Sequence, residues 1–274
     1  MRIDSSSWNM DYLGWSGFHI YRPDKPEGQQ LFIDPPKGTA FPRAFAITIF
    51  ITHGHPEHLG GTLDHVREIS SAQCTTVIAS ETICRYLSGE CRRSKVDFIK
   101  VEPGQKQDLA PDSSFEVFQW KHMPLLPPGL GAAAHHIFQI LRHFRAAWRI
   151  IRMSLNGPRG AGKMLGYLLR LPEGTNIIIY GEGLHRHSRA EDVATIGRKV
   201  SGATLIVATE PEDFAELPQL VAASGAARAI FYEPHRPWRD TFKLPHADLQ
   251  ALQKTVSAAG IPSKTLELNG QKPA

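Results

Sequence analysis

The sequence predicts an α/β protein in which β-sheets are covered by helices. Its 274 residues, of which 42% are hydrophobic, are enough for one large domain whose core needs no covalent cross-links. Strand-like runs lead the first half, at 17–21, 31–34, 44–52, 75–80, 96–101 and 114–120, with helices expected at 59–70 and 80–87. In the second half, a strand is expected around Tyr167, and strands at 176–180, 203–209 and 229–233 alternate with helices at 190–200, 218–225 and 247–260.

The bulk composition narrows the class of protein. A formal net charge of +4 is too weak to predict nucleic-acid binding, and no aromatic–basic interleaving supports it. Cys74, Cys84 and Cys91 have no CxxC spacing, which favours reduced thiols and a cytoplasmic location. The N-terminus lacks the apolar stretch of a secretory signal, and no run of about 18 apolar residues predicts a membrane span.

Three histidines stand close together where the strand at 44–52 ends. His53, His55 and His58 lie in the segment ITHGHPEHLGG, with Glu57 between the last two. Neutral imidazole is the commonest metal ligand, and residues two apart in an extended loop point the same way. His53 and His55 can therefore reach one ion, and His58, at a helix start, can face a second. A polar loop with ordinary hydrogen bonds explains one such histidine, but three within six residues favour a metal centre.

The histidine segment resembles a known signature. HGHPEHLGG is similar to the HxHxDH motif of the metallo-β-lactamase superfamily, with Glu57 in place of its aspartate. His122 in FQWKHMP, Glu182 in IIIYGEG and His235 in AIFYEPH follow predicted strands in the order of the family's remaining ligands. The opening YLGWSGFHIY…LFIDP resembles the subgroup of ascorbate-6-phosphate lactonase-like and N-acyl-phosphatidylethanolamine phospholipase D-like enzymes.

This resemblance implies a fold, a ligand set and an activity. The fold is an αββα sandwich of two packed sheets, forming a single domain over 1–274 with an inserted helical segment at 126–165. One divalent ion is expected on His53, His55 and His122, and a second on Glu57, His58 and His235, with Glu182 bridging the two. Zinc is the first expectation, with manganese or iron as alternatives. The implied activity is hydrolysis of an ester-type bond.

Two departures from the family pattern affect the second ion. Glu57 and Glu182 stand where the family has aspartates, so each carboxylate reaches about an ångström further while metal–oxygen distances stay near 2.0–2.2 Å. A single-metal site is therefore an alternative. When bound, such ions lower the pKa of a coordinated water, and Glu57 is a candidate to accept its proton. His185, in GEGLHRHSR, is a candidate general acid, with a histidine in a surface loop as the alternative.

A helix is expected at 135–155 within the insertion. Its apolar residues recur at helical spacing on one arc: Ile137, Ile140, Leu141, Phe144, Trp148, Ile151 and Leu155. Arg142, Arg145 and Arg149 lie on one flank as candidate substrate-binding residues, and no acidic residue occurs between Lys121 and Arg170. Three interpretations stay open: an ordinary helix packed on the domain, a lid or membrane-surface element, or a homodimer contact.

The sequence thus predicts a metal-dependent hydrolase of a small or amphiphilic ester. A phosphodiester or phospholipid-like compound and a lactone are the favoured substrates. The alternatives are a non-catalytic metal-binding scaffold, which the two glutamates favour, and a nuclease of the same fold, which the absence of a basic nucleic-acid domain disfavours.

Overall fold

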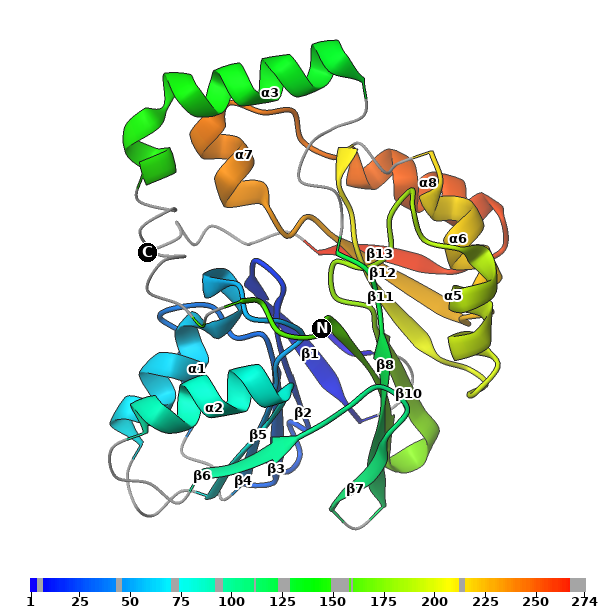
Figure 1. Cartoon of the computed structure of the whole chain (residues 1–274). Helices are drawn as coiled ribbons and strands as arrows, with labels where there is room; N and C mark the ends of the chain where they lie inside the picture. Colours follow the sequence, from blue (N-terminus) through cyan, green and yellow to red (C-terminus); the bar gives the residue numbers. More distant parts are fainter. Residues whose placement is uncertain are drawn as a thin grey trace.

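The computed structural model describes residues 1–3, 7–42, 46–69, 74–91, 96–110, 112–122, 129–148, 158, 160–211 and 215–266. Within these residues the chain forms two β-sheets that pack face to face, with helices on both outer faces (Figure 1). The predicted α/β class and the αββα layering are confirmed.

The first sheet is built by the N-terminal part of the chain in the order β1-β2-β3-β4-β5-β6. Its strands are β1 (Asn9–Gly14), β2 (Gly17–Tyr21), β3 (Gln29–Ile33), β4 (Ala46–Phe50), β5 (Cys74–Ala79) and β6 (Val96–Lys100). The first two pairings are antiparallel, and those from β3 to β6 are parallel. Helices α1 (Pro56–Glu68) and α2 (Glu81–Glu90) form the crossovers that parallel strands require.

The second sheet has the order β13-β12-β11-β10-β9-β8-β7. Its strands are β7 (Lys106–Ala110), β8 (Ser113–Gln119), β9 (Leu165–Leu171), β10 (Thr175–Ile179), β11 (Thr204–Ala208), β12 (Arg228–Tyr232) and β13 (Ser263–Leu266). Strands β7 to β10 pair antiparallel, and β10 to β13 pair parallel. The connecting helices are α5 (Ala190–Gly197), α6 (Leu217–Ala223), α7 (Arg236–Phe242) and α8 (Leu249–Ala258), and η1 (Pro172–Gly174) joins β9 to β10.

Three apolar layers hold the sandwich together. The layer between the sheets contains aromatic side chains from both, among them Phe50, Phe115 and Tyr167, and the Tyr167 hydroxyl donates to the Ile51 carbonyl oxygen at 2.7 Å. A second layer joins the first sheet to α1 and α2, and a third joins the second sheet to α5, α6 and α8. Because both faces of the parallel strands are covered, these strands read as continuous apolar runs rather than alternating ones.

Several predicted boundaries are corrected. Strands β1, β7 and β13 and helix α7 were not predicted, since they are short and β1, β7 and β13 lie at sheet edges.

The helix expected at 135–155 begins earlier, as α3 (Leu130–Arg142), and breaks at His143, whose φ of −103° and ψ of 38° are not helical. A further helical turn covers 144–148, and the predicted end of this helix, with Ile151 and Leu155, falls outside the described residues. Among the described helices, none is long and apolar enough to cross a membrane.

The contact between α5 and α6 supplies a stability test. An added Cβ at Gly197 would lie 1.6 Å from the carbonyl oxygen of Ser224, so Gly197→Ala requires a backbone shift. We expect Gly197→Ala to lower the free energy of unfolding by about 1–3 kcal/mol, measured by urea denaturation. Gly89→Ala is the matched control in α2, because nothing lies within 4 Å of its Cβ, and helix propensity predicts a gain of about 0.5–1 kcal/mol. Equal effects of the two substitutions would contradict this packing.

Candidate metal centre

The residues predicted to bind metal follow strand ends on the facing edges of the two sheets. His53 lies three residues after β4, His122 three after β8, Glu182 three after β10 and His235 three after β12. Within each sheet these strands run in the same direction, so the residues that follow them meet at one edge. This is the edge at which α/β proteins place their ligand sites.

Two overlapping groups of potential ligand atoms form at this edge. His53, His55 and His122 have ring nitrogens within 4.8 Å of one another, and so do His53 and His58 with a carboxylate oxygen of Glu182. The Nε2 atom of His53 lies 3.0 Å from Nδ1 of His55. His53, His58 and Glu182 are almost fully buried, whereas the side chain of His55 is 33% exposed. The centre is thus closed on one side and open on the other.

Glu182 lies between the histidines, and its two oxygens face different ones. Oε2 is 4.0 Å from Nε2 of His53 and 3.9 Å from Nε2 of His122. Oε1 is 3.2 Å from Nε2 of His58 and 3.4 Å from Nε2 of His235. One carboxylate therefore lies between two pairs of imidazoles.

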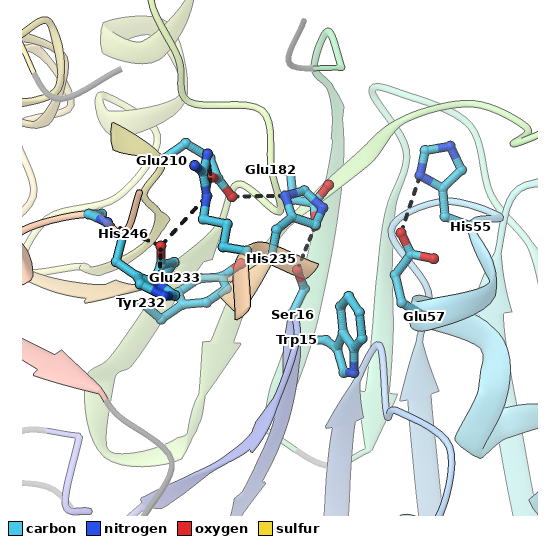
Figure 2. Close-up of polar contacts among 12 residues, drawn as sticks. Trp15, Ser16, His55, Glu57, Glu182, Glu210, Tyr232, Glu233, His235 and His246 are labelled. Atoms are coloured by element: carbon cyan, nitrogen blue, oxygen red, sulfur yellow. Dashed lines mark hydrogen bonds and ion pairs between the residues drawn. The ribbon is translucent and has the colours of Figure 1, made fainter. Parts of the chain in front are cut away.

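The local sequence around Glu182 explains its position. It follows β10 in the segment Gly181-Glu182-Gly183, and a Cβ on Gly183 would lie 2.5 Å from Cβ of Trp120. The absence of a side chain there lets Trp120 pack against this loop, and its ring stands edge-on to His53 with centroids 5.3 Å apart. Ser16, in the turn between β1 and β2, donates its hydroxyl to Oε1 of Glu182 at 3.0 Å (Figure 2).

Carboxylates behind the cluster orient two of the histidines. Asp34, which follows β3 with a φ of 40°, accepts from the backbone N–H of Thr52 at 2.8 Å and lies 2.8 Å from Nδ1 of His58. Glu210, two residues after β11, lies 2.8 Å from Nδ1 of His235 (Figure 2). A carboxylate accepts hydrogen bonds, so Nδ1–H of each histidine donates to it and Nε2 is the nitrogen that faces the cluster, as in metal-ligating histidines.

A second network fixes Glu210. The guanidinium Nε of Arg239, on α7, donates to Oε2 of Glu210 at 2.6 Å and lies 3.6 Å from Glu233. Glu233 in turn contacts Nδ1 of His246 at 3.1 Å (Figure 2). Arg239, Glu210 and Glu233 are buried, so these charges are paired rather than solvated.

The electrostatics of the cluster match a site for cations. Burial opposes ionisation of Glu182, but the imidazoles of His235 and His58 outweigh it and hold its pKa well below the ordinary value. Burial also opposes a charge on His58, yet Asp34 and Glu182 raise the pKa of this histidine well above its usual range, so an ion that binds Nε2 must displace a proton from it. Burial, together with His58, lowers the pKa of His53, which keeps that imidazole neutral and able to donate a lone pair.

The donor set fits a divalent metal. Oε2 of Glu182 is buried without a hydrogen-bond partner among the described residues, although two imidazole nitrogens lie about 4 Å from it. Two atoms that each ligate one tetrahedral zinc ion at about 2.0–2.2 Å are roughly 3.3–3.6 Å apart. The spacing is thus too long for hydrogen bonds but close to that of two ligands of one ion, and this explains why a buried carboxylate oxygen lacks a donor.

Glu57 and the predicted substrate residues occupy different surroundings. Glu57, in the first turn of α1, lies 3.8 Å from Nδ1 of His55 with its side chain 14% exposed, and it belongs to neither group of mutually close ligand atoms (Figure 2). Arg142 and Arg145 are exposed on and just after α3, and Arg149 lies outside the described residues.

The structure corrects the interpretation of His185 as a general acid. His185 is buried, its Nε2 lies 2.8 Å from the carbonyl oxygen of Lys121, and its Nδ1 accepts from the backbone N–H of His187. Both ring nitrogens are therefore engaged by the main chain, and neither is available to a substrate. Because Lys121 precedes His122, His185 acts on the position of that loop instead.

Sequence reasoning missed Asp34, Ser16 and Glu210 as functional residues. Asp34 and Ser16 stand in the opening LGWSGF…LFIDP, so the resemblance of that segment to known enzymes is the sequence signal for both. Glu210 could have been predicted from the sequence, because it follows a buried strand by two residues. It therefore lies at the same sheet edge as the other candidate ligands.

Comparison with known proteins identifies the fold. Neither a protein-family model nor a curated protein sequence matches the chain. Among solved structures, a candidate metal-dependent hydrolase from Parabacteroides distasonis has a TM-score of 0.59 at 13% identity, over 96% of this chain and 94% of its own. The metallo-β-lactamase fold protein YhfI from Bacillus subtilis has a TM-score of 0.57 at 10% identity, over 93% and 89%. Zinc-bound PqqB from Methylobacterium extorquens has a TM-score of 0.50 at 15% identity, over 92% and 87%.

These likenesses extend over nearly the whole chain at low identity, and they concern the arrangement of sheets and helices. The chain has the metallo-β-lactamase fold.

Proposed function

We propose that the protein is a metal-dependent hydrolase whose centre holds two divalent ions. The observation that carries the proposal is the division of the Glu182 carboxylate, with Oε2 toward His53 and His122 and Oε1 toward His58 and His235. Two solved structures of similar fold, a candidate metal-dependent hydrolase and a zinc-bound protein, support the proposal of a metal site.

The residues divide naturally between two positions. His53, His55 and His122 would hold the first ion, and His58 and His235 the second, with Glu182 shared. When bound, such ions activate a water as nucleophile and polarise the substrate bond. Glu57, at the partly exposed side of the cluster beside His55, would accept the proton that this water releases.

The open side of the centre indicates where a substrate enters. His55, His122 and His235 are 33%, 21% and 23% exposed, whereas the opposite side of the cluster is closed by Asp34 and Glu210. Two cations and partly exposed imidazoles suit a substrate that develops negative charge on oxygen in the transition state. We therefore favour an ester-type bond, in a phosphodiester or phospholipid-like compound or in a lactone.

Metal removal and a substrate panel test this proposal. The purified protein would be stripped with a chelator, reloaded with zinc or manganese, and assayed on an aryl phosphodiester, a lactone and an aryl carboxylic ester. We expect turnover of at least one ester by the loaded protein, its loss with chelator and its return with added metal. Metal content would be measured in parallel.

The position of Glu57 favours one rival function. Because its carboxylate stands apart from both groups of ligand atoms, a centre that binds metal without turning over substrate is the main alternative. Stoichiometric metal with no turnover on any of the three esters would support that metal-binding scaffold, whereas no stoichiometric metal would refute both functions.

A further inference from the structure

The largest apolar side chains that are exposed all belong to one short segment, among the residues that the structure describes. They lie on α3 and on the helical turn that follows it: Leu130, Ile137, Phe138, Leu141, Phe144 and Trp148, with exposed fractions from 45% to 92%. Single exposed apolar residues are normal on a soluble protein, but six gathered on one segment indicate an interaction surface.

The polarity of α3 is the reverse of that of an ordinary surface helix. Within α3, Leu130, Ile137 and Leu141 follow one another at spacings of seven and four residues, which places them along one side, and Phe144 and Trp148 are four residues apart on the turn after the break at His143. From Leu130 to His143, the positions that are partly covered by the protein are Ala133, His136, Gln139, Ile140 and His143, and only Ile140 among them has a large apolar side chain. A helix packed for its own stability buries its apolar side instead, whereas this helix turns most of its large apolar side chains away from the rest of the described residues.

The charge around this surface indicates the kind of partner. Arg142 and Arg145 are exposed beside the apolar side chains, and the sequence has no acidic residue from Lys121 to Arg170. A second copy docking through the same surface would bring arginines together with no carboxylate to pair them. An anionic lipid surface supplies both an apolar layer for the side chains and negative charge for the arginines.

The surface is connected to the metal centre at both ends of the insertion. The segment leaves the sheet after His122 and returns at Ala161, whose carbonyl oxygen accepts from the backbone N–H of Gly54, between His53 and His55, at 2.7 Å. In between, α3 lies over α7, which begins directly after His235 (Figure 1), and the ring of His143 meets that of Phe242 with centroids 6.2 Å apart.

We infer that α3 and the following turn dock the protein on an anionic membrane surface. The apolar side chains enter the boundary between headgroups and acyl chains, and Arg142 and Arg145 contact lipid phosphates. The helix is too short and too polar on its other side to span the bilayer, so it lies along the surface. Docking in this way holds the elements that carry the metal centre at the membrane, and it does not depend on the reaction that the centre catalyses.

Vesicle flotation with the full chain tests this inference. Vesicles of phosphatidylcholine that contain phosphatidylglycerol are compared with pure phosphatidylcholine, at low and high salt. We expect the protein to float with the anionic vesicles at low salt and to be released at high salt. The triple substitution L141S/F144S/W148S removes exposed side chains only, and we expect it to weaken vesicle binding more than about 100-fold.

A charge-matched pair of variants separates local contact from net charge. Both R142E/R145E and K254E/K264E lower the formal charge from +4 to 0, since two reversals each remove two charges, and all four side chains are exposed. We expect only the arginine pair to weaken binding, on the order of 30-fold. Equal weakening by both pairs would overturn a specific docking surface.

Tryptophan quenching reports contact directly. Brominated lipids should quench part of the fluorescence of the wild-type protein, and Trp148→Phe should remove most of that quenching. Vesicle binding that the triple substitution leaves unchanged would overturn the inference. A second result would also overturn the inference: the protein does not bind anionic vesicles but forms dimers at higher concentration, and the triple substitution abolishes the dimers. The surface would then be a contact between two copies.

Discussion

Replacing Glu182 by glutamine is expected to abolish stoichiometric metal binding while leaving the fold intact. Each oxygen of Glu182 faces a different pair of imidazoles, so the amide group of glutamine would present N–H donors to one pair and a single neutral acceptor to the other. Mutating a residue that hydrogen-bonds to a metal ligand typically lowers metal affinity about 10–100-fold. Removing a carboxylate that two ions would share should therefore lower metal affinity more than about 100-fold.

The measurement is metal content after dialysis, together with the shift in Tm that zinc produces. Wild-type protein should gain stability with added zinc because the ions bind the folded state, and Glu182→Gln should lose most of this shift. Glu57→Gln is the matched control, because its carboxylate lies outside both groups of mutually close ligand atoms. Glu57→Gln should keep the ion on the three-histidine position. Retention of full metal content by Glu182→Gln would refute the shared-carboxylate arrangement.

Replacing Asp34 by asparagine is expected to weaken metal binding about 10–100-fold, although Asp34 is not itself a ligand. Its carboxylate accepts a hydrogen bond from Nδ1–H of His58, so Nε2, which faces Glu182 and the second ion position, is the nitrogen that would give up its proton to an ion. In Asp34→Asn the backbone N–H of Thr52 still needs an oxygen acceptor, so the amide oxygen of asparagine faces Thr52. The amide NH₂ group then faces Nδ1 of His58 and donates to it. The proton of His58 then moves to Nε2, where it blocks the lone pair.

Asp34→Asn tolerates the same backbone, because aspartate and asparagine both accept the positive φ of 40° found at this position. Zinc affinity would be measured by competition with a chelator, and the tautomer of His58 by nitrogen NMR of the imidazole. Asp240→Asn serves as control, since it removes a carboxylate that lies 3.1 Å from Nε2 of His246, outside the cluster. If Asp34→Asn bound zinc as tightly as the control, the tautomer argument would fail.

Part of the candidate site could be predicted from the sequence because three of its residues are close together in the chain. His53, His55 and His58 lie within one loop after a strand, so the sequence itself places their side chains close together. The apolar periodicity of the insertion likewise predicted a helix and its arginine flank, although the break at His143 had no clear sequence signal. Strands buried on both faces were recognisable from continuous apolar runs, whereas edge strands such as β13 were not.

The amino-acid sequence by itself determined the secondary structure of the central strands and the types of residue available for metal binding. Only the tertiary structure decided that Asp34 and Glu210 orient His58 and His235, that His185 is engaged by the main chain, and that α3 turns its apolar side outward. The physical reason is that these outcomes depend on contacts between residues far apart in the chain, which are set by how two sheets and an inserted helix pack. Periodicity indicates that a helix has an apolar side, but the packing of the whole chain determines what that side meets.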